Sequence, residues 1–263
     1  MNNIHEIRSS SKIALVEAGV ILTTLHQAVN ENDLMFPLTF GARGSATIGG
    51  VLSTNAGGSN VLKYGNTRDL VLGVEIVLPN GDIMNLMSEL HKDNSGYCLR
   101  DLVIGAEGTL GIITQAVLKL FPKPKAHATA MVAVKSLDHA LALLNELQEG
   151  TGGAVAAYEY MPKRYIQGYM ELSSSSRKPF QKDYDHLVMI ELETTVELFS
   201  RSTDDGQVLL SGELERILNK NLVDGSILDA HIAQNEEQRL IMWERREAAA
   251  EISLLKKPLI NND

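Results

Sequence analysis

Glycine and small polar residues dominate residues 41–58, GARGSATIGGVLSTNAGG, in which Arg43 is the one charged residue. Glycine has no Cβ, so it allows positive φ and lets the backbone approach a flat ligand closely. The serines, threonines and asparagine between the glycines add short hydrogen-bonding groups, and successive backbone N–H groups in turns can form an anion site without lysine. The pattern favours a bulky phosphate-bearing cofactor, and a surface cluster of turns is the alternative.

A second glycine-rich stretch, residues 105–111 (GAEGTLG), follows a predicted helix over 99–104 and precedes the β-branched run IITQAVLKL. We expect its three glycines and Glu107 to face residues 41–58. Glu107 either hydrogen-bonds to a cofactor or to the glycine turns, or it is a helix-terminal charge in water. Arg43 either assists a pyrophosphate or pairs with a carboxylate, and the second is favoured.

Several other site types find no support in the sequence. There is no GxGxxG after a strand and no GxxxxGK[ST] loop, so neither a Rossmann nor a P-loop site is predicted. The seven histidines lie singly, so no metal site is predicted, and the single cysteine, Cys98, excludes an intramolecular disulfide. A net charge of -9 without a basic stripe argues against nucleic acid and against anionic membranes. No apolar run approaches the ~20 residues of a transmembrane helix.

The elements that must position these stretches follow from hydrophobic periodicity and turn residues. A strand (13–18), a helix (20–30) and a hairpin (71–78 and 82–86) around Pro79-Asn80-Gly81 are predicted before Pro122 and Pro124, where the composition changes. Beyond them we expect four strands and four helices. The strands are 129–134, 155–160, 186–195 and 222–227, and the helices are 137–147 with a Ser136 cap, 162–170, 204–220 and 233–255.

This order predicts an α+β fold whose second part is an antiparallel sheet with helices on one face. Two domains are expected, residues 1–122 and 123–263. The polar N-terminal stretch is not a signal peptide.

The segments GARGSATIGGVLSTNAGG, VLKYGNTRDLVLGVEIVLPNGD and DNSGYCLRDLVIGAEGTLGIIT resemble, in the same order, the second half of the FAD-binding domain of vanillyl-alcohol-oxidase-type (PCMH-type) flavoproteins. They most resemble the branch of D-2-hydroxyglutarate dehydrogenase, D-lactate dehydrogenase and glycolate oxidase. The resemblance covers residues 12–122 and implies FAD as cofactor. The cofactor-binding residues that it implies are Gly49, Gly50, Thr54, Asn55, Ala56, Gly57, Gly58, Tyr64, Gly65, Gly105, Glu107, Gly108, Gly111, Ile112 and Ile113.

Residues 123–263 resemble the FAD-linked-oxidase cap domain. In 2-hydroxyacid dehydrogenases of this branch, a W-x-x-R-E motif supplies an arginine that grips the substrate carboxylate, and here that arginine is Arg246, one turn after Trp243. The alternative is a solvated arginine in a charged helix. A threonine of the family is replaced by Ala250, and an expected lysine falls on Asn261 or a neighbour, which weakens 2-hydroxyglutarate as the substrate.

The family's pyrophosphate-binding first half, its GHxGDGNxH motif and its EHG motif do not occur in these residues. The resemblance therefore implies a central fragment, inactive alone, with no catalytic residue or metal ligand to be named. Its full-length relatives are FAD-dependent oxidoreductases, which oxidise a D-2-hydroxyacid such as D-lactate, D-2-hydroxyglutarate or glycolate to the 2-oxoacid by hydride transfer to flavin.

The partner we expect is a small-molecule 2-hydroxyacid, while the electron acceptor and a homo-oligomeric assembly stay open. A cytoplasmic location is expected, or a mitochondrial one in a eukaryote. The alternative function is a non-catalytic flavin-binding or interaction subunit. A third alternative is a related flavoenzyme that resembles alkylglycerone-phosphate synthase or aldonolactone oxidase, and the W-x-x-R-E motif argues against it.

Overall fold

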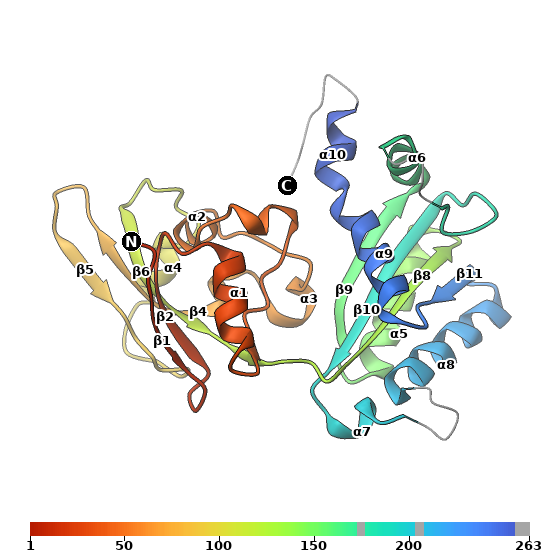
Figure 1. The fold of residues 1–263 in the computed structure, drawn as a ribbon, viewed down its shortest axis with the longest axis horizontal. Coiled ribbons are helices and arrows are strands. Elements are labelled where there is room, and N and C mark those ends of the chain that lie inside the picture. Colours follow the sequence, from red (N-terminus) through yellow and green to blue (C-terminus); the bar gives the residue numbers. More distant parts are fainter. Residues whose placement is uncertain (173–176, 203–207, 256–263) are drawn as a thin grey trace. The chain divides into compact units, whose positions relative to one another are not determined.

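A computed structural model describes residues 1–172, 177–202 and 208–255. The chain divides into two compact units, Met1–Lys123 and Pro124–Asp263, which are described separately below (Figure 1). Within the described ranges, no helix combines the length and the apolar character that crossing a membrane requires.

The first unit is built on a five-stranded antiparallel sheet of order β1-β2-β6-β4-β5. The strands are β1 (Ile4–Arg8), β2 (Ile13–Glu17), β4 (Val71–Val77), β5 (Ile83–Leu86) and β6 (Ile112–Lys119), and β3 (Leu34–Met35) pairs separately with β7 (Phe121–Pro122). The predicted hairpin is confirmed as β4 and β5. Strand β1 was not predicted, because an edge strand with mostly exposed or half-buried polar residues lacks a clear apolar period.

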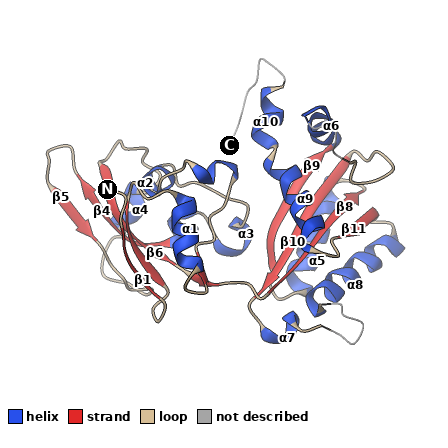
Figure 2. Cartoon of the chain, in the orientation of Figure 1, coloured by secondary structure: helices blue, strands red, loops and turns tan. Residues whose placement is uncertain are grey.

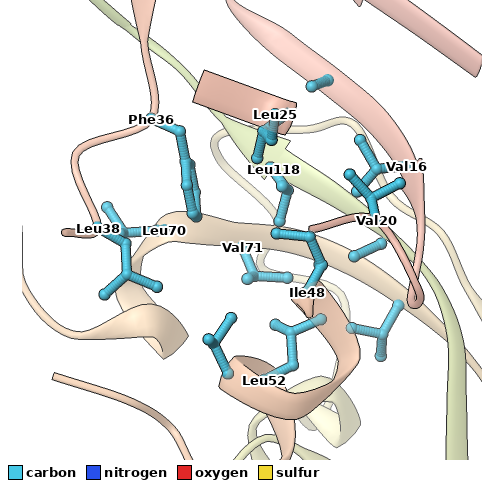
Figure 3. Packing of buried hydrophobic residues seen from close by; sticks show 14 of the residues in the cluster. Val16, Val20, Leu25, Phe36, Leu38, Ile48, Leu52, Leu70, Val71 and Leu118 are labelled. Atoms are coloured by element: carbon cyan, nitrogen blue, oxygen red, sulfur yellow. The ribbon is translucent and has the colours of Figure 1, made fainter. Parts of the chain in front are cut away.

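The helices of this unit are short. They are α1 (Leu22–Asn30), α2 (Ile48–Ser53), α3 (Val61–Tyr64) and α4 (Leu99–Val103), with 3₁₀ turns η1 (Gly41–Gly44) and η2 (Thr67–Leu70). Figure 3 shows side chains of α1, α2, β4 and β6 packed in one core. Ile48 and Leu52 of α2 are fully buried in it. The first glycine-rich stretch is therefore anchored to the core on both sides of Gly49 and Gly50.

The second unit contains a four-stranded antiparallel sheet of order β11-β8-β10-β9. Its strands are β8 (Ala126–Val134), β9 (Val155–Pro162), β10 (His186–Thr194) and β11 (Ile227–Ile232). Its helices are α5 (Leu137–Gly150), α6 (Lys163–Leu172), α7 (Glu197–Ser200), α8 (Leu209–Asp224), α9 (Glu236–Glu247) and α10 (Ala249–Leu254). Ser136 caps α5 as predicted, because its side chain accepts a hydrogen bond from the backbone N–H of His139.

The α+β class is confirmed, but the expectation that helices cover one face of this sheet is wrong (Figure 2). Helices α5 and α8 pack with Val132 on one face, while residues of α6 and α9 pack with Met131 on the other. Successive residues of β8 are buried, and a strand buried on both faces needs cover on both.

Two predicted elements differ from the structure. Residues 222–224 belong to α8, not to a strand, and the helix ends where Gly225 adopts φ +77°. The predicted helix 233–255 is divided at Ala248 into α9 and α10. The predicted start of the helix 204–220 and the closing Pro258 lie outside the described residues.

Candidate functional site

The two glycine-rich stretches are joined by backbone hydrogen bonds in the first unit. The N–H of Gly105 donates to the carbonyl of Leu52 at 3.0 Å, and the N–H of Glu107 donates to that of Ser53 at 2.9 Å. Leu52 and Ser53 end helix α2, which the core holds in place. Residues some 50 positions apart in the sequence therefore lie side by side.

Arg68 connects the same two stretches a second time. Its backbone N–H donates to Asn55 Oδ1 at 2.9 Å, and its Nη2 donates to the carbonyl of Ile104 at 2.6 Å. The preceding Thr67 donates from both its N–H and its hydroxyl to the carbonyl of Ala56. The sequence interpretation did not single out Arg68, although the polar run Asn66-Thr67-Arg68-Asp69 directly after Gly65 was visible.

Replacing Arg68 by leucine is expected to lower the free energy of unfolding of the first unit by about 1–3 kcal/mol, because a charge-assisted hydrogen bond to the Ile104 carbonyl is lost. Urea denaturation followed by circular dichroism measures this change. Arg8→Leu, which removes exposed pairs with Glu6 and Glu89, is the matched control with a smaller effect. Equal effects of the two substitutions would contradict a bridging role for Arg68.

Most backbone N–H groups of the predicted cofactor residues are already used inside the protein. The N–H groups of Thr54, Asn55 and Ala56 donate to the carbonyls of the preceding helix, α2. The N–H groups that remain without an acceptor, in the part of the chain that the structure describes, include those of Gly57, Gly58 and Gly108. These three N–H groups are therefore candidates to donate to a bound anion.

The predicted cofactor glycines also differ in what lies next to the position that a Cβ atom would take. A Cβ on Gly49 would lie 2.8 Å from Ala18 Cβ, and one on Gly58 would lie 2.6 Å from the Thr39 carbonyl oxygen. A Cβ on Gly111 would lie 2.7 Å from the Val77 carbonyl oxygen. These three glycines allow the protein to pack against itself. Gly108 adopts φ +77° with open space around its Cβ position, so it leaves room for a ligand.

The remaining predicted cofactor residues are placed as follows. Gly50 donates to the Thr47 hydroxyl, Gly65 packs against Asp69, and Tyr64 packs edge-to-face on Phe121 with ring centroids 4.7 Å apart. Ile113 is 5% exposed and belongs to the core, so its side chain is not on this surface.

Apolar side chains lie in sequence on both sides of Gly108. Leu102, Leu110 and Ile112 are 64%, 48% and 60% exposed, respectively. Glu107 is exposed and has φ +52°, which is uncommon for a residue with a side chain.

The predicted substrate arginine, Arg246, lies on α9 in the second unit. Its Nε donates to Glu159 Oε2 at 2.5 Å, and its side chain is 31% exposed. Its two terminal nitrogens form no hydrogen bond with any described residue. Glu159 therefore orients the guanidinium and leaves the paired terminal N–H groups available, which is the edge that binds a carboxylate with two hydrogen bonds.

Helix α9 is fixed to the sheet by a buried carboxylate, Glu191 of β10. Arg239 donates to both of its oxygens, from Nε at 2.9 Å and from Nη2 at 2.8 Å, and Trp243 Nε1 donates to Oε2 at 2.6 Å. The Thr129 hydroxyl donates to the same oxygen at 2.9 Å. Trp243 of the W-x-x-R-E motif is thus a contact to the sheet, one turn before Arg246.

The protonation of this group follows from its donors. Burial by itself raises the pKa of Glu191, but the facing His127, Arg239 and Trp243 together lower it by a larger amount, so the pKa falls to about 2. The sequence interpretation missed Glu191, for which the only signal was its position between Ile190 and Leu192 in the run HLVMIELET. The carboxylate is therefore ionised at neutral pH and serves to position α9.

The partner of Arg43 was expected to be a pyrophosphate or a carboxylate. In the structure its Nη1 donates to the carbonyl of Phe40 at 3.3 Å. Among the described residues, no three acidic, histidine or cysteine side chains are grouped closely enough to hold a metal ion.

Comparison with protein families identifies two matching models. Residues 1–87 match the model described as "FAD binding domain", and residues 123–261 match "FAD linked oxidases, C-terminal domain". The second match covers the sheet of the second unit and the helix that carries Arg246.

Curated relatives extend these matches over the chain. It is 33% identical to D-2-hydroxyglutarate dehydrogenase, mitochondrial, of Rattus norvegicus over 254 residues, which are 95% of this chain and 45% of the relative. It is 33% identical to the enzyme of the same name from Arabidopsis thaliana, covering 95% of this chain and 43% of that protein. It is 29% identical to D-2-hydroxyglutarate dehydrogenase of Xanthomonas citri pv. viticola, covering 52% of that protein. The chain thus spans about half the length of these relatives.

Among solved structures, an alkyldihydroxyacetonephosphate synthase superposes with a TM-score of 0.67 at 18% identity. The superposition covers 97% of this chain and 45% of that chain. At this identity the likeness concerns the fold alone.

Proposed function

Because the chain belongs to the FAD-linked oxidases, we propose that it carries part of the FAD surface and the substrate-binding arginine of a dehydrogenase that oxidises a D-2-hydroxyacid to the 2-oxoacid. The observation that carries the proposal is the joining of the two glycine-rich stretches through Leu52 and Ser53. The relatives named D-2-hydroxyglutarate dehydrogenase support the class of reaction.

The residues of the first unit fit FAD in two respects. The N–H groups of Gly57, Gly58 and Gly108 are suited to bind phosphate oxygens, because no described acceptor uses them. Leu110 and Ile112 follow the open Gly108 in the sequence, and their exposed apolar side chains suit a flat aromatic ring. When bound, the flavin accepts the hydride that leaves the Cα of the hydroxyacid.

The residues of the second unit suit the carboxylate that every 2-hydroxyacid carries. Arg246 offers two terminal nitrogens, and Glu159 fixes its orientation. Binding through a planar fork holds the substrate in one orientation, as hydride transfer requires. Ala250, on α10, offers no hydroxyl where the family has a threonine, so we leave the substrate at the class of D-2-hydroxyacids.

Gly108→Ala tests the FAD surface. We expect it to weaken FAD binding to the purified chain more than tenfold, because a methyl group would occupy the space left for the ligand. Gly81→Ala is the matched control, since Gly81 lies in the same unit with φ +90° and equally open space, and strains the backbone alike. Titration of FAD fluorescence measures affinity. Equal affinities of the two variants would remove Gly108 from the site.

Turnover separates the enzyme from a non-catalytic flavin-binding subunit. Because residues 1–263 are expected to be inactive alone, the test uses the protein at the full length of its relatives. D-lactate, D-2-hydroxyglutarate and glycolate are offered in turn to this FAD-loaded protein with an artificial electron-accepting dye. Reduction of the dye that depends on one hydroxyacid supports the dehydrogenase. FAD binding without any such reduction supports the subunit.

A further inference from the structure

A cavity with charged residues in its wall borders helix α9, and Arg246 is not among its lining residues. It has a volume of about 560 Å³ and is bordered by α9, by Met131 of β8, by His231 of β11, by Tyr169 of α6 and by residues 177–179. All of these belong to the second unit. The cavity therefore needs no contribution from the first unit or from the FAD surface.

Arg245 is the unusual residue of its wall. It is 4% exposed, and its Nε has no hydrogen-bond partner. Its Nη2 donates to the Arg177 carbonyl at 3.2 Å, and its guanidinium lies 5.6 Å from the centre of the Tyr169 ring. No described carboxylate forms an ion pair with it.

The other arginines that α9 presents to this unit are paired. Arg239 is bound by the buried Glu191, and Arg246 is bound by Glu159. A buried charge without a counterion is costly, since several kcal/mol of hydration are lost on burial. The protein keeps such a charge at Arg245 while its neighbours on the same helix have partners.

The charges that face Arg245 do not supply that partner. Arg177 and Lys178 add positive charge to the wall, although Lys178 pairs with Asp183 at 2.8 Å, and His231 is an exposed histidine at its border. The two acids of the wall, Glu237 and Glu244, lie on the exposed side of α9. Exposed carboxylates are solvated and screened, so they offset a buried guanidinium weakly. The wall therefore carries three basic side chains, of which Lys178 is paired with Asp183, and its own two acids are solvated.

The rest of the wall is apolar. Met131 and Met242 are buried at its base, and Ile241 and Tyr169 add to it. Inorganic anions gain nothing from such a surface, whereas an organic anion buries its hydrocarbon part against it. The planar fork of an arginine is matched in geometry by a carboxylate.

We infer that this cavity binds a small organic monocarboxylate, with its carboxylate on Arg245 and its apolar body against Met131, Met242 and Ile241. The site is separate from the proposed substrate arginine, Arg246, and its occupancy does not depend on FAD. It would hold an effector or a second organic acid of the same chemical class as the reaction's substrates and products.

Hexanoate is the probe, and isothermal titration calorimetry on the purified chain measures its binding. We expect saturable binding that is weakened at least tenfold by Arg245→Met. Arg164→Met, which removes an exposed arginine of α6, is the matched control and should leave hexanoate binding unchanged. Inorganic phosphate at equal concentration should not displace hexanoate.

Thermal unfolding gives a second readout that a purely structural role would not produce. Without hexanoate, Arg245→Met should melt at or above the temperature of the unaltered chain, because it removes a buried charge that lacks a counterion. With hexanoate, only the chain that retains Arg245 should gain in melting temperature.

Three results would overturn the inference. The first is the absence of saturable binding to the unaltered chain, and the second is equal weakening by both arginine substitutions. The third is displacement of hexanoate by phosphate at equal concentration, which would show a general anion patch. None of these results bears on FAD binding or on Arg246, so a failure here leaves the proposed function standing.

Discussion

Glu191→Gln is expected to lower the free energy of unfolding of the second unit by about 3–5 kcal/mol, the usual cost of breaking a buried ion pair from one side. The glutamine amide cannot accept from all the donors that surround the carboxylate. Arg239 would stay buried without its counterion, and an N–H of the amide would face another donor. Urea denaturation, followed through Trp243 fluorescence, measures the change.

The control and the pH dependence follow from the same contacts. Glu213→Gln removes a surface pair with Arg216 and should cost less than about 1 kcal/mol. Since the pKa of Glu191 is lowered to about 2 from 4.5, its stabilising effect is complete above pH 4.5 and is lost as the pH falls toward 2. Glu191→Gln should lack this part of the acid dependence. An unchanged acid profile would contradict the role given to Glu191.

Arg246→Met is expected to reduce kcat/KM for the hydroxyacid about 100-fold, which corresponds to about 2.7 kcal/mol of lost transition-state binding. The expected loss combines the two terminal N–H groups with the charge that faces the substrate carboxylate. Steady-state kinetics of the protein at the full length of its relatives, with the hydroxyacid that gives turnover, measures this loss. Arg246→Lys keeps the positive charge but not the planar fork, so its kcat/KM should lie between those of the unaltered protein and Arg246→Met.

Arg164→Met again serves as the control, since Arg164 is an exposed arginine of the same unit. A change in KM alone would assign Arg246 to binding, and a fall in kcat as well would show that it orients the substrate for reaction. If kcat and KM both stay within twofold of the unaltered protein, Arg246 does not contact the substrate. FAD affinity should be the same in all these variants.

The composition of the sequence identifies the glycine-rich stretches, but it does not show which of their backbone groups are free to contact a ligand. Six glycines in residues 41–58 suffice to predict close backbone approach. Whether the close neighbour is a ligand or the protein itself depends on distant residues. The Thr39 carbonyl beside Gly58 and the Val77 carbonyl beside Gly111 are tertiary contacts that no local pattern encodes. The same holds for the link from Arg68 to Ile104.

In the second unit, too, the sequence does not show which residue of a helix is buried or where the helix ends. Arg245 and Arg246 are neighbours in sequence, so they point about 100° apart around the helix axis. The motif identifies Arg246, yet Arg245 is the more deeply buried of the two. Leu222 and Val223 have the composition of a strand, but helix α8 continues through them until Gly225. Packing, which local propensity does not contain, decides both cases.

The bonds from Gly105 and Glu107 to Leu52 and Ser53 have a thermodynamic consequence. They hold the loops of the proposed FAD surface in place with the protein's own main-chain contacts. Little conformational entropy then remains to be lost when the cofactor docks, so more of the interaction energy appears as affinity. The surface is preorganised, and loss of the nucleotide should leave the main chain of these loops in the same arrangement.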